Sequence, residues 1–231
     1  MKNGIKRVNT GIPGLDDLIE GGIPEGSTVL VSGGPGSGKT IFSLQFLIAG
    51  AVKGEKGIYI SLEEDINRLR NYISRIFDWP LEKLLKEKKL IMIKAEFFDF
   101  EKFKNLVENE VEKNKAKRLA IDPITVLSLF FEKPLEIRRS LLELDRLLKK
   151  LGCTTLLTCE IPEGSRSISS FGIEEFTSDG IILLYYLLKG YPRALSVRKM
   201  RATRHDIGIH PFEITKKGIV VYPREKIFRA E

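Results

Sequence analysis

Short apolar runs rich in β-branched residues recur along the chain, and longer amphipathic stretches separate them in its first two thirds. The spacing within the longer stretches predicts helices over 40–51, 67–77, 101–112 and 135–151, the last of which ends at Gly152. Strands that alternate with helices in this way predict a parallel sheet with helices on both faces. The predicted strands cover residues 28–31, 58–62, 90–93, 119–121, 154–159, 181–185, 195–197, 212–214 and 219–221.

Only short turns separate the last four apolar runs, so we expect the sheet to finish with antiparallel strands. The final two runs predict a closing hairpin, with Gly218 near its bend. At 231 residues the chain is long enough to bury a sizeable core without disulfides or metals. We therefore predict a single α/β domain over residues 1–231.

The composition is that of a globular protein, with 42% apolar and 30% charged residues. No apolar run approaches the ~18 residues of a membrane span, and the first residues contain no apolar signal stretch, so we expect a cytoplasmic protein without a membrane partner. The net charge of +7 favours anionic partners, either nucleotide phosphates or nucleic acid. Cys153 and Cys159 lie too far apart along one predicted strand to form a disulfide, and we expect two buried thiols.

The strongest motif is the glycine-rich segment GGPGSGKT, which starts at Gly33. It matches G-x-x-x-x-G-K-[ST] between a predicted strand and a predicted helix, as a phosphate-binding loop does, whereas the alternative is a turn that binds nothing. Its backbone N–H groups and the positive end of the helix would hold the phosphates. Lys39 would reach the β- and γ-phosphates, and the Thr40 hydroxyl would bind Mg²⁺. The predicted nucleotide-binding residues of this loop are Gly34, Pro35, Gly36, Ser37, Gly38, Lys39, Thr40 and Ile41.

Acidic residues follow two further predicted strands. Asp122 ends the apolar run RLAID, where its carboxylate would complete the Mg²⁺ shell through a water, although it could instead cap a turn before Pro123. Glu63 and Glu64 follow the strand at 58–62, at the edge where open α/β sheets place their chemistry. One of them could be the base that orients water for hydrolysis, but adjacent acids also suit the first turn of a helix.

The order of these motifs resembles that of the RecA superfamily and, within it, of the KaiC-like ATPase domains of bacteria and archaea. The resemblance covers nearly the whole chain, beginning with TGIPGLD at 10–16 and GGIPEG at 21–26. Its most diagnostic part is the last third, with FGIEEF at 171–176, Ser178-Asp179, KMRATRH at 199–205 and PFEIT at 211–215. The resemblance implies a RecA-like P-loop NTPase fold: a mostly parallel central sheet flanked by helices, with antiparallel strands at the C-terminal end.

The resemblance also implies a shared nucleotide site. Family members form rings, usually hexamers, with ATP at the subunit interfaces, so this chain would be a ring homo-oligomer that uses ATP and Mg²⁺. Glu63 would be the catalytic base, with Glu64 beside it. The positions that match residues around the nucleotide are Lys199, Arg201 and His205, which would reach the neighbouring subunit's nucleotide, Thr203 and Thr215 near it, and Arg70 against the adenine.

Taken without the resemblance, Lys199 and Arg201 would be basic residues on a solvated strand edge. Both alternate along one predicted strand and should therefore project to the same face. A ring gives such a pair a use, because an arginine supplied by a neighbour can stabilise the charge that develops on the γ-phosphate.

Two features separate this chain from the clock protein of the family. That protein carries two such domains in tandem, and this chain carries one. Its C-terminal domain phosphorylates adjacent Ser and Thr residues, but Glu175 and Phe176 occupy the corresponding positions here. Neither side chain can accept a phosphate, which favours hydrolysis over self-phosphorylation at that place. Ser169 and Ser170 leave a displaced site open.

Three functions are compatible with these patterns. The first is a ring-forming ATPase whose turnover drives a conformational change or a signal. The second is a RecA-like single-stranded DNA-binding ATPase, although the segment 162–176, roughly where recombinases contact DNA, has three Glu and one Arg and is a poor phosphate partner. The third is a nucleotide sensor without turnover, which the presence of Glu63 disfavours.

Overall fold

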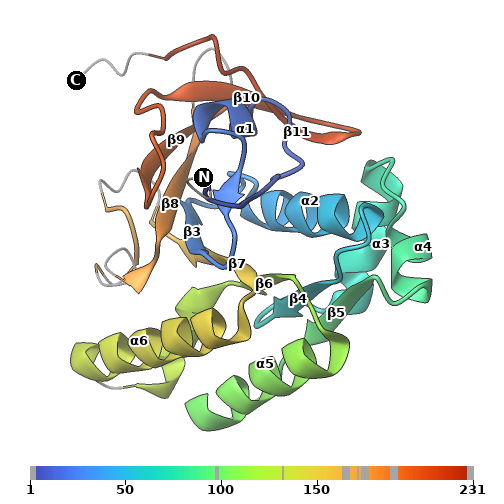
Figure 1. Ribbon diagram of the computed structural model, residues 1–231, viewed down its shortest axis with the longest axis vertical. Coiled ribbons are helices and arrows are strands. Elements are labelled where there is room, and N and C mark those ends of the chain that lie inside the picture. The colour runs from blue at the N-terminus through green and yellow to red at the C-terminus, as the bar shows by residue number, and fades with distance from the viewer. Residues whose placement is uncertain are drawn as a thin grey trace.

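The computed structural model describes residues 4–96, 99–131, 133–162, 167–170, 172, 177–187 and 192–227. Within these residues the main sheet has nine strands in the order β11-β10-β9-β8-β3-β7-β6-β4-β5 (Figure 1). The six strands from β8 to β5 in this order are parallel. These strands are β3 (Thr28–Gly33), β4 (Gly57–Ser61), β5 (Leu90–Lys94), β6 (Arg118–Asp122), β7 (Thr154–Glu160) and β8 (Gly180–Tyr186).

The remaining three strands extend the sheet in antiparallel fashion, as the sequence predicts. They are β9 (Arg193–Met200), β10 (His210–Thr215) and β11 (Gly218–Val221). β10 and β11 form the expected closing hairpin, in which Thr215 is paired with Gly218. Gly218 has a φ of 105°, and a Cβ there would lie 2.3 Å from the Gln45 side-chain oxygen, so the bend requires glycine.

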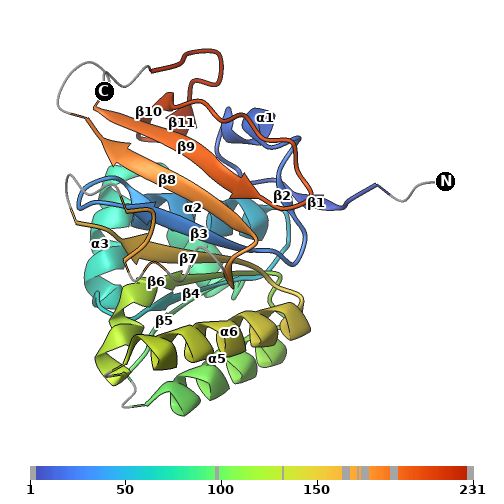
Figure 2. The ribbon, with the colours of Figure 1, turned by 90° about the vertical axis from the view of Figure 1, so that its left-hand side faces the viewer.

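Helices cover both faces of the sheet. Figures 1 and 2 show α5 and α6 side by side on one face, with α2 on the other. Successive side chains of β3 point to opposite faces of the sheet. Val29 and Val31 pack in the core with α2, while Leu30 packs in the core with α5 and α6. The helices are α2 (Lys39–Val52), α3 (Ile66–Ile76), α4 (Leu81–Lys86), α5 (Phe100–Asn114) and α6 (Pro134–Leu151), which ends at Gly152 as predicted.

The sequence patterns missed several short elements. These are β1 (Arg7–Val8), α1 (Leu15–Leu18), β2 (Ile23–Pro24), α4 and the 3-10 helix η1 (Ile124–Phe130). β1 and β2 form a separate two-stranded sheet in the N-terminal segment. Each of these strands has two residues, too few to carry a periodic pattern.

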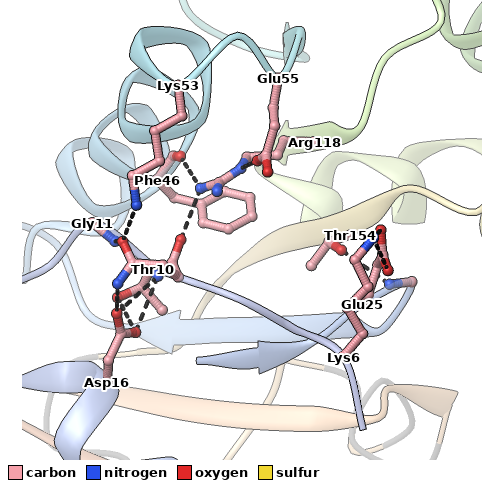
Figure 3. A network of polar contacts seen from close by, with 12 residues as sticks. Lys6, Thr10, Gly11, Asp16, Glu25, Phe46, Lys53, Glu55, Arg118 and Thr154 are labelled. Carbon is pink, nitrogen blue, oxygen red and sulfur yellow. Dashed lines mark hydrogen bonds and ion pairs between the residues drawn. The ribbon is translucent and has the colours of Figure 1, made fainter. Parts of the chain in front are cut away.

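The N-terminal segment is fastened to α2 by the buried Arg118 at the start of β6 (Figure 3). Its guanidinium donates to the carbonyls of Asn9 and Phe46, at 3.0 and 2.8 Å, and lies over the Phe46 ring. Its Nε pairs with the Glu55 carboxylate at 2.7 Å. Burial lowers the pKa of Arg118, and Glu55 opposes that shift by stabilising the charged form.

A single buried side chain joins three distant parts of the chain. Gln45, in the middle of α2, donates to the carbonyls of Gly11 and Ile219, both at 3.0 Å. Its side-chain oxygen accepts from the Ile219 N–H at 2.6 Å. The helix that follows the glycine-rich loop is thereby tied to the N-terminal segment and to β11.

Two further expectations can be compared with the structure. Cys153 and Cys159 are buried free thiols, as predicted. Among the described helices, none is long and apolar enough to cross a membrane.

Candidate functional site

The carboxyl ends of four parallel strands, β3, β4, β6 and β7, meet at one edge of the sheet and open into a cleft of about 680 Å³. A cleft of this size suits a small-molecule ligand. Its lining residues are Pro35, Gly36, Gly38, Lys39, Thr40, Ile41, Tyr59, Glu63, Glu64, Arg68, Tyr72, Asp122, Pro123, Glu160, Arg193 and Ile214. The glycine-rich loop, both predicted acids and Asp122 are thus brought together.

The glycine-rich loop curls between β3 and α2. Gly36 and Gly38 have φ angles of 70° and 101°, in the left-handed region that lets the N–H groups turn inward. The buried Lys39 ammonium donates to the carbonyls of Gly33 and Gly34, at 2.9 and 3.1 Å. Burial lowers the pKa of Lys39, and the nearby Glu160 and Asp122 carboxylates oppose that shift. Gly34 and the buried Ser37 belong to the loop without lining the cleft, among the described residues.

Asp122 accepts hydrogen bonds from three hydroxyl groups at the floor of the cleft. Thr40 donates to its Oδ2 at 2.7 Å and Tyr59 to the same atom at 2.6 Å, while Thr158 donates to its Oδ1. Burial raises the pKa of Tyr59 well above its ordinary value, and Asp122 adds to the shift, so the phenol stays a donor. The Thr40 hydroxyl and the Asp122 carboxylate both line the cleft, and they supply hard oxygen atoms of the kind that could hold Mg²⁺.

Glu63 and Glu64 stand in the turn after β4 and do not form the start of a helix. α3 begins at Ile66, and its N-cap is Asp65, whose carboxylate accepts from the Arg68 N–H at 2.9 Å. Glu63 is exposed at the mouth of the cleft. The half-buried Glu64 accepts from the Tyr72 hydroxyl at 3.0 Å, and burial together with Glu64 raises the pKa of Tyr72. Glu63 is therefore the more accessible of the two carboxylates.

Arg193, the first residue of β9, also belongs to the cleft and was not predicted from the sequence. Its Nε donates to the Gly36 carbonyl at 3.0 Å, and its guanidinium lies 5.3 Å from the centre of the Tyr186 ring. A usable signal was present, because a strand that returns antiparallel to the predicted strand at 181–185 must begin near the edge that holds the loop. Tyr59, Arg68, Tyr72, Pro123 and Ile214 were also missed.

Four residues expected to reach a neighbour's nucleotide or to lie near it are away from this cleft. β9 begins at the cleft and runs antiparallel to β8, so its last residues pair with Gly180 and Ile181 at the opposite edge of the sheet. Thr203 accepts there from the Arg7 guanidinium at 2.8 Å. The residues in question are Lys199, Arg201, Thr203 and His205, of which none lines the cleft within the described part of the chain.

One expectation about these residues is wrong. Arg201 does not share a strand with Lys199, because β9 ends at Met200 and Arg201 lies in the following turn. A register shift opposite Ile181 and Ile182 also interrupts the alternation before that end.

Two other predicted nucleotide contacts have partners elsewhere. Arg70 pairs with Glu82 of α4 at 2.7 Å, and Arg68, two residues earlier on α3, lines the cleft in its place. Thr215 donates to the Gly218 carbonyl within the closing hairpin, whose Ile214 lines the cleft. Glu175 and Phe176, on which the argument against self-phosphorylation depends, lie outside the described residues. Ser169 is buried and Ser170 is exposed.

Comparison with known proteins agrees with this geometry. The family model described as "ATPase: KaiC" matches residues 8–226. The chain belongs to the KaiC-like ATPase family. A UPF0273 protein of Thermotoga maritima is 40% identical over 240 residues, covering 96% of this chain and 98% of the relative. The circadian clock oscillator protein KaiC of a Nostoc species is 36% identical and matches 96% of this chain, which spans 45% of that relative.

A solved KaiC-like structure confirms the RecA-like α/β fold of this family member. The crystal structure of a KaiC-like protein from the hyperthermophilic archaeon Pyrococcus horikoshii superimposes with a TM-score of 0.86 at 44% identity, covering 95% of this chain and all of that one. Membership of a KaiC-like ATPase family supports ATP as the ligand of the cleft.

Proposed function

We propose that this KaiC-like chain hydrolyses ATP with Mg²⁺ at sites shared between the subunits of a ring homo-oligomer, and that turnover is coupled to a conformational change. The loop N–H groups and Lys39 would hold the phosphates. Thr40, and Asp122 through a water, would hold Mg²⁺, which would neutralise negative charge on the phosphates. Glu63 would orient the attacking water and accept its proton.

One observation above all supports a shared site: within one subunit, the cleft and the predicted cations of the interface lie at opposite edges of the sheet. The cleft lies at the carboxyl edge of the parallel strands, whereas Lys199 and Arg201 lie at the amino edge. A subunit cannot present both edges to one phosphate group. Two neighbours packed edge to edge can, and the basic residues of one then face the acid-lined cleft of the other.

Subunit mixing tests this proposal. Arg201→Ala subunits lack the cation supplied to the neighbour, and Glu63→Gln subunits lack the base, so we expect each variant alone to release little phosphate. In mixed rings some interfaces pair an intact base with an intact arginine, and activity should partly return. Light scattering with and without ATP and Mg²⁺ gives the ring mass, and labelled subunits verify exchange. A mixture that exchanges subunits but stays inactive would contradict the shared site.

A further inference from the structure

A group of charged side chains gathers at the amino edge of the sheet, on the side opposite the cleft. It draws on the C-terminal end of α6, the residue before β8 and the end of β9. We call it the amino-edge cluster, and its members are Asp145, Lys149, Asp179, Lys199 and Arg201.

Asp179 is fixed to the start of β3 by two hydrogen bonds. Its N–H donates to the Thr28 carbonyl at 2.8 Å, and its Oδ2 accepts from the Thr28 N–H at 3.2 Å. The residue is 8% exposed. β3 ends at Gly33, where the glycine-rich loop begins, so the Asp179 carboxylate is tied to the strand that leads into its own subunit's loop.

All three cations of the cluster are held by residues 178 and 179. Arg201 donates its backbone N–H to the Asp179 carbonyl at 2.9 Å and brings its guanidinium to 3.8 Å from Oδ1 of the same residue. The Lys149 ammonium lies 3.4 Å from that oxygen and 2.8 Å from the Asp145 carboxylate. Lys199 donates to the Ser178 carbonyl at 2.6 Å.

The exposed fractions of these side chains are those expected if Asp179 supports cations that face outward. The Arg201 side chain is 60% exposed, while that of Asp179 is 12% exposed. The carboxylate is therefore held in place beneath a guanidinium that solvent or another molecule can reach. Burial lowers the pKa of Lys199, and the nearby Arg201 adds to that shift, as expected where cations are kept close together.

We propose that Asp179 is a positioning residue for the cations that a subunit supplies to its neighbour's nucleotide, and that Lys149 is a third cation of that group. The proposal rests on the shared site proposed above. It assigns Asp179 to the supplying side of the interface, and it makes β3 the rigid link between a subunit's own loop and the cations it offers.

The test is steady-state ATP hydrolysis by Asp179→Asn rings, with ring mass and ATP affinity measured in parallel. The amide keeps an oxygen for the Thr28 N–H but loses the charge that orients Arg201 and Lys149. We expect kcat to fall about ten- to a hundredfold, as a misplacement of about 1 Å does, with ring mass and ATP affinity unchanged. The matched control is Asp16→Asn, which removes a carboxylate that accepts hydrogen bonds from Asn9 and Thr10 and should leave kcat unchanged.

Mixing variant subunits tests whether Asp179 acts on the side of the interface that supplies the cations. Asp179→Asn should regain activity with Glu63→Gln subunits, and it should not regain activity with Arg201→Ala subunits, which lack the same side. The proposal would be overturned if mixing Asp179→Asn with Arg201→Ala subunits restored activity. It would also be overturned if the kcat of Asp179→Asn equalled that of Asp16→Asn. Should Asp179→Asn not fold, Lys149→Met provides the test, because substitution of a half-exposed helical side chain is expected to change stability little. An unchanged kcat in Lys149→Met would then overturn the proposal.

The same experiment separates the two proposals. If Arg201→Ala and Glu63→Gln subunits fail to restore each other, the shared site itself is wrong. If they succeed and Asp179→Asn does not group with Arg201→Ala, only the role of Asp179 is wrong.

Discussion

The hydroxyl of Thr40 donates to the carboxylate of Asp122 across 2.7 Å, joining the first turn of α2 to the last residue of β6. The two residues lie 82 positions apart in the sequence, and both line the cleft. The hydroxyls of Tyr59 and Thr158 also donate to the same carboxylate. These three hydrogen bonds fix the orientation of the Asp122 carboxylate.

Asp122→Asn should weaken the Mg²⁺ dependence of ATP binding. The amide keeps the shape but loses the negative charge, and changes to residues that support a bound metal cost about 10- to 100-fold in affinity. ATP affinity measured with Mg²⁺ should fall toward the value measured with a chelator. Tyr59→Phe is the control, since it removes one donor and leaves the carboxylate. Equal Mg²⁺ dependence in wild type and Asp122→Asn would exclude Asp122 from the metal site.

Lys39→Ala should remove most nucleotide affinity. The ammonium is the cation that the loop would place beside the phosphates, and a charge-assisted contact contributes ~1.5–3 kcal/mol, which is about ten- to a hundredfold in affinity. Titration with a fluorescent ATP analogue measures the loss. Lys53→Ala, at the other end of the same helix, should bind normally. If Lys39→Ala also binds normally, the loop is not the site.

Glu63→Gln should bind ATP and fail to hydrolyse it. The amide cannot accept a proton, and loss of a general base typically costs about 10²–10⁴ in rate. Glu64→Gln should retain more activity, because Glu64 is held by Tyr72 while Glu63 is exposed at the cleft mouth. Phosphate release distinguishes them. The reverse order would exchange their roles, and two fully active variants would direct attention to Glu160 at the end of β7.

Gln45→Leu should destabilise the fold by about 3 kcal/mol. The substitution leaves the Gly11 carbonyl and both backbone groups of Ile219 buried without their partner, and each such group costs ~1–3 kcal/mol, partly offset by the added apolar surface. Chemical denaturation measures the change. Leu44→Met, a volume-conserving change at the neighbouring buried position, is the control and should cost less than about 1.5 kcal/mol.

Protonation of Asp206 should lower the stability of the fold in strong acid. The Gly208 N–H, the Lys226 ammonium and the His210 ring lower the pKa of Asp206 to about 2. A carboxyl whose folded pKa is below its unfolded value of about 3.9 contributes stability that is complete above that value. The contribution is lost as the pH falls to 2. The denaturation midpoint of the wild type should therefore be higher than that of Asp206→Asn at neutral pH. The difference between the two midpoints should disappear near pH 2. A constant difference would contradict the assignment.

The nine main strands could be predicted because each contains a run of apolar residues, and the central strands are buried along nearly their whole length, which leaves a continuous pattern. The loop residues, Asp122 and Glu63 were predictable for a related reason: parallel strands bring their carboxyl ends to one edge, whatever lies between them in sequence. β1 and β2 were not predictable, because two residues carry no period.

Positions that depend on side-chain direction were less predictable. Arg68 and Arg70 differ by two helical steps, or about 200° around α3, so a choice between them needs the rotation of the helix about its axis. Arg201 was placed on the strand because the sequence does not reveal where β9 stops. The structure ends it at Met200, where the Arg201 N–H donates to the Asp179 carbonyl instead.

The contacts of Gln45 have a consequence for the order of events during synthesis. Its partner Ile219 lies 174 positions later, in β11, so α2 gains this anchor only after β11 has left the ribosome. N-terminal parts can form early in vectorial folding, but the nucleotide cleft would close only once the terminal hairpin docks. We expect nascent chains that end at residue 209 to bind ATP far more weakly than chains that extend through β11, and equal binding by both would refute this order.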